Sequence, residues 1–450
     1  MKILQYVLVL TIMISSLAYA DDIAVTIYNS NIGVVSENRQ LNFKKGTNQI
    51  EIQDVPALID PASVRFELAG NNKIAILEQN YAFDLVSPDQ MYLKYIDKEI
   101  ELVTEEGNVF KGILLTAGGG AITLQEDSGR IKIVQLSKIS EVNFPVLPDG
   151  LITKPTLFWK YSSDFEGNAD GNISYQTSGM NWTAEYVGLL NEDDTKLSLN
   201  GWASINNQSG KTYDNATLKL IAGDIHRAQP EIRGGRGYVK TMSLAEADQA
   251  GFEEKSFFEY HMYTLPRKAT VANKENKQIS LFEPSTATVE KVFLYRPDSN
   301  PEKVDVALKF VNSEKTGLGM PLPAGRVRLF KADTDGSKIL LGEDRIKHTP
   351  KDEKVTVQVG TAFDITAEYK MLSQNRVSNK VEEQQIEITL NNRKDSPVTV
   401  EIEKKLYGYW EITQADFEYE KKDAQTIICK QKIEKSGSKT ITFTVRYTFR

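Results

Sequence analysis

The chain has 450 residues, of which 40% are hydrophobic and 26% are charged, and its formal net charge is −7 at pH 7. These proportions are typical of a globular protein, and the length is enough for roughly two to four domains that each bury a core. The net negative charge argues against a general nucleic-acid-binding protein, which needs a basic surface to displace counterions from the phosphate backbone.

Residues 1–20 have the pattern of a secretory signal peptide. Lys2 precedes an apolar run that ends in small residues at Ala18 and Ala20. Signal peptidase accepts small side chains at these two positions, so we expect cleavage between Ala20 and Asp21. The run is short for the ~20 residues that cross a bilayer as a helix, which disfavours a retained membrane anchor. We therefore expect an exported protein, periplasmic or secreted, that is not an integral membrane protein after cleavage.

Beyond residue 20 the sequence predicts an all-β fold, with several β-sandwich or barrel modules in tandem. Short runs of Val, Ile, Thr, Tyr and Phe alternate with polar residues and are separated by Gly, Asn and Asp. This is the pattern of strands and turns. Residues 21–88 are expected to form an N-terminal β-sandwich domain. Its strand-like runs are IAVTIYN, VSENRQLNF, NQIEIQDV, ASVRFELAG and NKIAILEQNYAF.

Residues 89–148 predict a small SH3-like or Sm-like β-barrel. Short strand-like runs follow one another closely, and the turns at 118–120 and 127–129 contain the glycine that positive φ angles favour. Tight meanders of this kind often close into a barrel, because closure removes exposed strand edges. Such a barrel can bind RNA, but the acidic and exported character of the chain favours a structural or protein-binding module.

Residues 149–372 carry longer alternating runs and predict a central β-sandwich domain with a flexible insertion at 231–255. The composition changes sharply in that insertion. Ser243 and Glu246 have the spacing of a capping box, in which each side chain bonds a backbone N–H of the first helical turn. We therefore expect a short helical insertion near 243–250 that ends at Gly251.

Residues 373–450 have the pattern of an immunoglobulin-like β-sandwich. Its alternating runs are IEITLNN, VTVEIEKKLYGYWEI, AQTIICKQKI and KTITFTVRYTFR. The last run also suits a transmembrane barrel strand, but charges on both faces of most other runs disfavour that alternative. The lone cysteine, Cys429, lies among apolar residues. We expect a buried thiol there, and cores that hold without an internal disulfide.

The sequence contains no G-x-S-x-G, H-E-x-x-H, P-loop or dinucleotide-binding pattern. Two acidic-histidine pairs remain, Asp224 with His226 and Glu259 with His261. Side chains at i and i+2 of a strand share a face, so two such pairs on neighbouring strands could hold a divalent metal ion. No spacing rule links the pairs, which favours ordinary hydrogen bonds near strand ends. We expect no catalytic residue, no cofactor and no metal, and the alternative is a metal site at these four residues.

Two aromatic clusters could stack on sugars or anchor a partner. They are LFWKY at 157–161 and LYGYWEI at 406–412. Strands are rich in such residues whatever their role, so core packing is the favoured interpretation. The strongly patterned stretch at 201–224, GWASINNQSGKTYDNATLKLIAGD, predicts two strands joined across a polar turn and not a catalytic segment.

Several segments resemble the exported bacterial proteins of domain-of-unknown-function family 4139. They are ISYQTSGMNWTAEYVGLLN, LNGWASINNQSGKTYDNATLKLIAGDIHR, FFEYHMYTLPRKATVANKENKQISLF and LNNRKDSPVTVEIEKKLYGYWEI. The similarity covers most of the chain from TIYNSNIGVVSENRQLNF onward. It implies a mostly β, secreted or periplasmic protein and brings no catalytic residues with it. The loop at 233–255 has little recognisable pattern, so no role is assigned there.

These observations lead to one hypothesis and one alternative. The hypothesis is a non-catalytic, exported, multi-domain β protein that acts as a binding or scaffold component of the bacterial cell envelope. Its expected partner is an envelope protein or a glycan, and not a nucleic acid. The alternative is a metal-dependent hydrolase that uses Asp224, His226, Glu259 and His261.

Overall fold

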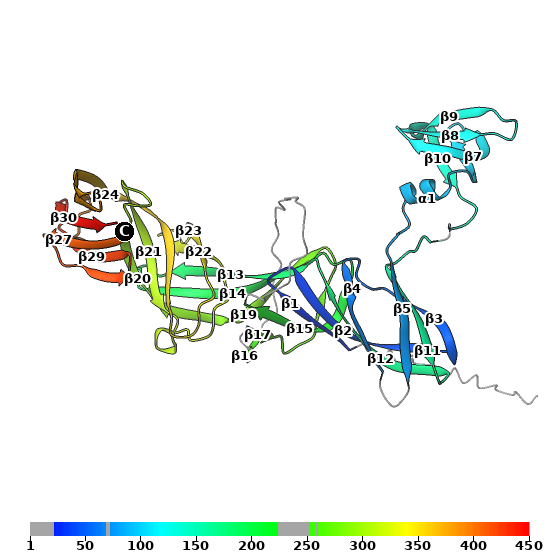
Figure 1. Cartoon of the computed structure of the whole chain (residues 1–450), viewed down its shortest axis with the longest axis horizontal. Helices are drawn as coiled ribbons and strands as arrows, with labels where there is room; N and C mark the ends of the chain where they lie inside the picture. The colour runs from blue at the N-terminus through cyan, green and yellow to red at the C-terminus, as the bar shows by residue number, and fades with distance from the viewer. Residues whose placement is uncertain (1–21, 69–72, 149, 224–251, 258–259, 450) are drawn as a thin grey trace, which may run out of the picture.

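The computed structural model describes residues 22–68, 73–148, 150–223, 252–257 and 260–449. Figure 1 shows an elongated arrangement of β-sheets, with one small module standing apart from the others. This confirms the all-β fold class and the succession of several modules. The signal peptide with its cleavage point at Ala20 and Asp21, and the helix expected near 243–250, lie outside the described residues.

The first sheet has the strand order β16-β17-β15-β1-β2-β12-β4, with β18 beside β15. Its strands are β1 (Ile23–Tyr28), β2 (Ile32–Phe43), β4 (Ile59–Leu68), β12 (Gly167–Thr177), β15 (Tyr213–Ala222), β16 (Glu253–Phe257), β17 (Tyr260–Thr264) and β18 (Ala269–Val271). β1 is antiparallel to β2 but parallel to β15, with Val25 opposite Leu218. The N-terminal strand therefore lies between its neighbour in the sequence and a strand from much later in the chain.

A second sheet packs against the first and completes a sandwich. It has the order β3-β11-β5, from β3 (Gly46–Gln53), β11 (Thr156–Ser163) and β5 (Ile74–Ala82). Trp159 and Tyr161 of β11 are buried, and the ring of Tyr161 meets Phe43 of β2 edge to face at 5.1 Å. The core-packing interpretation of the aromatic cluster at 157–161 is therefore confirmed.

The strand pairing crosses the predicted boundary between domains 21–88 and 149–372. Strands from both segments share the two sheets of this sandwich, and one apolar core contains residues from Ile23 to Val357. The physical reason for the difference is that hydrophobic alternation marks where strands are, but not which strands pair.

The small module lies between β5 and β11 in the sequence. It consists of α1 (Pro88–Lys94), β6 (Glu99–Thr104), β7 (Val109–Gly118), β8 (Ala121–Gln125), β9 (Ile131–Gln135), the 3₁₀ turn η1 (Leu136–Lys138) and β10 (Ile139–Asn143). The strand order is β10-β6-β7-β8-β9, so all the strands of this sheet come from the predicted module 89–148. The helix α1 was not predicted. Its signals were present, since Ser87 caps the N-terminus by accepting a bond from Gln90 N and Pro88 opens the first turn.

A further sheet extends the molecule from this sandwich. It has the order β19-β14-β13-β22-β23, from β13 (Met180–Leu190), β14 (Lys196–Asn207), β19 (Glu275–Thr288), β22 (Gly325–Ala332) and β23 (Lys338–Ile346). β14 pairs with β13 and β19, whereas the next strand, β15, lies in the first sheet. The stretch at 201–224 therefore contains two strands and a polar turn, as predicted, but the strands do not pair with each other.

The C-terminal sheet has the order β27-β30-β25-β24-β21-β20-β26-β29-β28. Its strands are β20 (Glu290–Tyr295), β21 (Lys303–Val311), β24 (Lys354–Ser378), β25 (Val381–Asn392), β26 (Val398–Lys405), β27 (Tyr409–Ala415), β28 (Glu420–Asp423), β29 (Thr426–Ile433) and β30 (Ser438–Thr448), and the 3₁₀ turn η2 (Glu314–Thr316) follows β21. β24 runs through the predicted boundary at 372/373. It pairs with β21 in its first half and with β25 in its second half.

Cys429 lies on β29 and is buried, as predicted. Of the helices in the described part of the chain, none combines the length and the apolarity that crossing a membrane requires.

Candidate binding site

The predicted metal site lies mostly beyond the part of the chain that the structure covers. Asp224, His226 and Glu259 are outside the described residues. His261 is on β17, where it stands opposite Ala222 of β15 and Ser256 of β16. Within the described ranges, no three His, Cys, Asp or Glu side chains form a group that could hold a metal ion. Convergence of the two acidic-histidine pairs therefore stays a prediction.

A buried ion pair fixes the turn that follows β14. Lys211 Nζ lies 2.8 Å from Glu37 Oε2 on β2, and both side chains are almost completely buried. The other carboxylate oxygen of Glu37 accepts bonds from Arg39 at 2.7 Å and from the Tyr175 hydroxyl at 3.3 Å. Burial lowers the pKa of Lys211, and the charge of Glu37 opposes that effect. Since these charges are already paired, they fasten the turn to the sheet and do not face a ligand.

The same turn is held by amide and hydroxyl bonds. Asn207 Nδ2 donates to the carbonyl oxygens of Lys211 and Val271, at 2.9 and 3.0 Å. Asn207 Oδ1 accepts from the backbone N–H and the hydroxyl of Ser209. The polar residues of this stretch therefore bond their own backbone, which supports the fold interpretation of the stretch.

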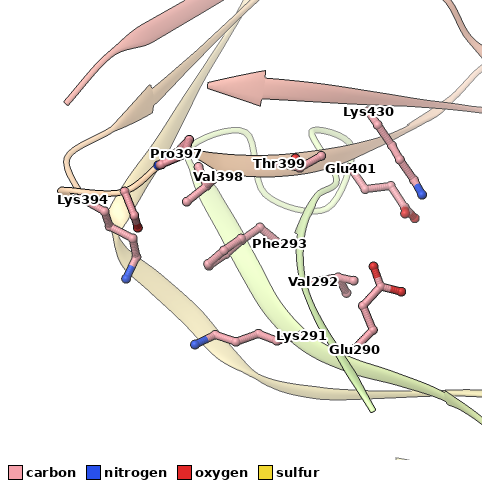
Figure 2. A pocket seen from close by; sticks show the side chains of 11 residues that line it. Glu290, Lys291, Val292, Phe293, Lys394, Pro397, Val398, Thr399, Glu401 and Lys430 are labelled. Carbon is pink, nitrogen blue, oxygen red and sulfur yellow. The ribbon is translucent and has the colours of Figure 1, made fainter. Parts of the chain in front are cut away.

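An open groove lies between β20 and β26 in the C-terminal sheet. Its volume is ≈ 360 Å³. Figure 2 shows Phe293 and Val398 in the middle of the groove, with Lys291 and Lys394 at one end and Lys430 toward the other. We call this site the lysine groove. Most of its lining residues are polar or charged, and the apolar part is supplied by Val292, Phe293, Pro397 and Val398.

The lysines of the groove differ in how firmly their charges are paired. Lys291 Nζ lies 2.7 Å from Asp194, whereas Lys394 Nζ lies 4.0 Å from Asp364. Among the described residues, Lys430 has no carboxylate within 4.0 Å, although Glu401 stands opposite it on β26. Lys394 and Lys430 are therefore the cations that are most available to an incoming anion.

Acidic residues in and beside the groove are mostly neutralised by lysines from the neighbouring strands. Glu401 accepts a bond from Lys309 at 2.7 Å. Burial acts to raise the pKa of Asp194, but hydrogen bonds from Lys291 and Lys331 outweigh it and hold the pKa below its ordinary value. Both carboxylates are therefore paired with lysines. Glu290 also lines the groove, so three lysines stand against two glutamates and the formal charge of the lining is 3 − 2 = +1.

An apolar groove of ≈ 190 Å³ continues from the lysine groove. The two share Lys291, Phe293 and Lys394. Leu341 and Val359 line the second groove, and Phe363 stands at its rim with its side chain almost fully exposed. Together the two grooves offer a lysine-rich end and an apolar end to one extended ligand.

The sequence did not point to this site. β20, the segment 394–398 and Lys430 lie far apart in the chain, and the parallel pairing of β20 with β26 brings them together. The only local signal was a lysine near each strand, which is common on any protein surface. The second aromatic cluster lies elsewhere in the C-terminal sheet, where the ring of Tyr407 stacks on the buried Tyr447 at 4.0 Å.

Exposed apolar side chains are a second surface feature, and they are concentrated on the small module and its two connecting segments. They are Phe83, Leu85, Val86, Leu93, Ile96, Val109, Ile113, Ile131, Ile133, Leu136, Val146 and Leu147. Contiguous exposed apolar surface marks interaction sites on soluble proteins. The sequence predicted a protein-binding or structural role for this module.

Comparison with protein families matches most of the described chain. The family described as "Domain of unknown function (DUF4139)" matches residues 172–449, which is more than half of the chain. The family described as "N-terminal domain of unknown function (DUF4140)" matches residues 25–113. A search of curated proteins found no match.

Proposed function

We infer that this chain, which belongs to the DUF4139 family, is a non-catalytic binding or scaffold component of the bacterial cell envelope. The observation that carries the proposal is the lysine groove, where Lys394 and Lys430 stand near the apolar side chains of Phe293 and Val398. The signal peptide pattern at 1–20 supports export, and the lack of catalytic motifs in the sequence supports a binding role.

The chemistry of the groove selects a negatively charged ligand with apolar groups. Lysine stems pack along apolar surface while their ammonium groups stay in water, so one side chain contacts both kinds of ligand group. Phe363 and Leu341 extend the apolar part beyond the lysines. An acidic segment of an envelope protein, with an apolar side chain beside its carboxylates, fits this arrangement.

Charge reversal in the groove tests the proposal. Envelope fractions are passed over the immobilised full chain, over Lys394→Glu with Lys430→Glu, and over a matched control, Lys380→Glu with Lys439→Glu. Both control lysines are exposed and lie outside the groove, Lys439 on β30 and Lys380 in the turn between β24 and β25. We expect the wild type and the control to recover the same partner and the groove variant to lose it. The proposal fails when the wild type recovers no reproducible partner, or when the groove variant recovers it equally well.

A further inference from the structure

Strand β9 forms one end of the sheet in the small module. In the part of the chain that the structure describes, β9 pairs with β8 alone. The outward-facing backbone N–H and C=O groups of an end strand have no partner strand, and another extended chain can pair with them. The edge of β9 is therefore a backbone template of five residues, Ile131–Gln135.

The side chains beside this edge are apolar. Ile131 and Ile133 are 56% and 70% exposed. On the next strand, β8, Gln125 stands opposite Ile131. On its other side Gln125 stands opposite Ile113 of β7, which is also exposed. Because directly opposed residues share a face of the sheet, Ile113, Ile131 and Ile133 form one surface, which we call the isoleucine face.

The single charged residue of β9, Lys132, leaves the isoleucine face uncharged. Charged side chains, including inward-pointing ones, are among the features that protect end strands, but the charge of Lys132 is already compensated by Glu126. Lys132 stands opposite the buried Leu124, and its Nζ lies 3.3 Å from the centre of the Phe110 ring and 3.5 Å from Glu126. Its charge is therefore directed to the face of the sheet opposite the isoleucine face.

Two other end strands of this protein, β28 and β10, carry polar or charged side chains. β28, at one end of the C-terminal sheet, has the sequence EKKD with all four residues exposed. β10, at the other end of the small module, presents Ser140, Glu141 and Asn143 to solvent. In contrast to β28 and β10, β9 combines an open backbone edge with exposed isoleucines.

We propose that β9 is the docking site for an extended segment of a partner protein, which pairs with its edge as a further strand of the module. The segment carries β-branched or aromatic side chains at alternating positions, since these pack on Ile131 and Ile133 across neighbouring strands. A stable contact between two folded copies takes about 20 to 30 residues on each side. β9 offers five, which suits a peptide segment and is too few for a symmetric dimer. This inference does not depend on the lysine groove.

Peptide selection on the full chain tests the proposal. A library of displayed random peptides is selected on the wild type, and the enriched peptides are measured by fluorescence anisotropy with the wild type, Ile133→Asp and Val146→Asp. Val146 is the matched control, because its side chain is 69% exposed on the same module but lies outside β9. We expect enriched peptides with alternating apolar residues, affinity about tenfold lower for Ile133→Asp, and affinity within about twofold of wild type for Val146→Asp.

A proline at the centre of an enriched peptide removes a backbone donor and should abolish binding. Amide hydrogen exchange supplies a second readout, because strand addition should slow exchange in β9 only when the peptide is present. The proposal is overturned when no peptide is enriched, when Ile133→Asp binds as well as the wild type, or when proline has no effect. It is also overturned when the wild type dimerises in solution through β9 and Ile133→Asp does not, since the occupant would then be a second copy.

Discussion

Lys211 in the turn after β14 and Glu37 in the middle of β2 form an ion pair of 2.8 Å inside the first sandwich. Removing one member of a buried pair is strongly destabilising, and without Lys211 the buried carboxylate of Glu37 keeps Arg39 as its remaining cationic partner. We expect Lys211→Met to lower the free energy of unfolding by about 3 kcal/mol. Lys160→Met breaks the equally short but exposed pair with Glu78, and should cost less than about 1 kcal/mol. Urea unfolding of both variants measures the difference, and equal losses would contradict the structural role of Lys211.

Acid stability should depend on Asp194. Its folded pKa lies below the ordinary value of 3.8 because Lys291 and Lys331 bond its carboxylate. The unfolded chain therefore binds more protons at acidic pH, and the stabilisation is complete above the unfolded pKa and is lost as pH falls through the folded pKa. We expect Asp194→Asn to lower the melting temperature at about pH 6, with a smaller difference from wild type at about pH 3. A difference that stays constant with pH would rule out this ionisation as the cause.

Association at the lysine groove should weaken as salt rises. Lys430 and Lys394 are at the protein surface, so their attraction to an anionic partner is screened over about 8 Å at physiological ionic strength. Phe293→Ala removes apolar contact and should lower affinity by a factor that varies little with salt. The measurement is the dissociation constant of the recovered partner across a series of salt concentrations. Binding of the wild type that does not change with salt would exclude a role for the lysines.

The reactivity of Cys429 should report on the folding of the C-terminal sheet. Burial raises the pKa of its thiol to about 12, and the thiolate is the reactive form. We expect slow labelling by a thiol reagent in the native protein and fast labelling in urea, with one labelled site because the chain has one cysteine. Cys429→Val keeps a similar volume and should change stability by less than about 1.5 kcal/mol. Fast labelling of the native protein would show that β29 opens readily.

Metal removal should have no effect on stability. The acidic-histidine pairs are the alternative metal site, and a metal bound to the native state alone stabilises it by its binding free energy. We expect elemental analysis of the purified protein to detect no stoichiometric zinc or manganese, and chelator to leave the melting temperature unchanged. The alternative metal site would be established if chelator lowered the melting temperature of the wild type but not that of the double variant His226→Ala/His261→Ala.

Much of the local structure could be predicted from the sequence. The alternation in IAVTIYN and TITFTVRY marked real strands, because burial of one sheet face requires a period of two. Trp159 and Cys429 were predicted to be buried from their apolar neighbours, and both are. These features depend on residues close together in the chain.

The parts that could not be predicted depend on pairing between distant strands. The sequence around Val25 does not indicate that Val25 stands opposite Leu218. Likewise, the sequence around Lys430 does not indicate that Lys430 stands opposite Glu401 on the neighbouring strand. The lysine groove arises from such pairings, so no short sequence motif predicts it. The exposed edge of β9 was missed for a similar reason, because a tight meander suggested a closed barrel and the end strand is recognised only when the order of strands is known.

The position of β1 between β2 and β15 has a consequence for how the chain acquires its structure. The two family matches, at 25–113 and 172–449, divide the strands of the first sheet between them, so that sheet is complete only when both segments are present. During synthesis β1 is made long before β15. One edge of β1 therefore stays unpaired until β15 has been synthesised. High contact order of this kind slows folding and lengthens the exposure of unpaired edges. We therefore expect the nascent protein to need protection against aggregation until its last sheet-forming segments are available.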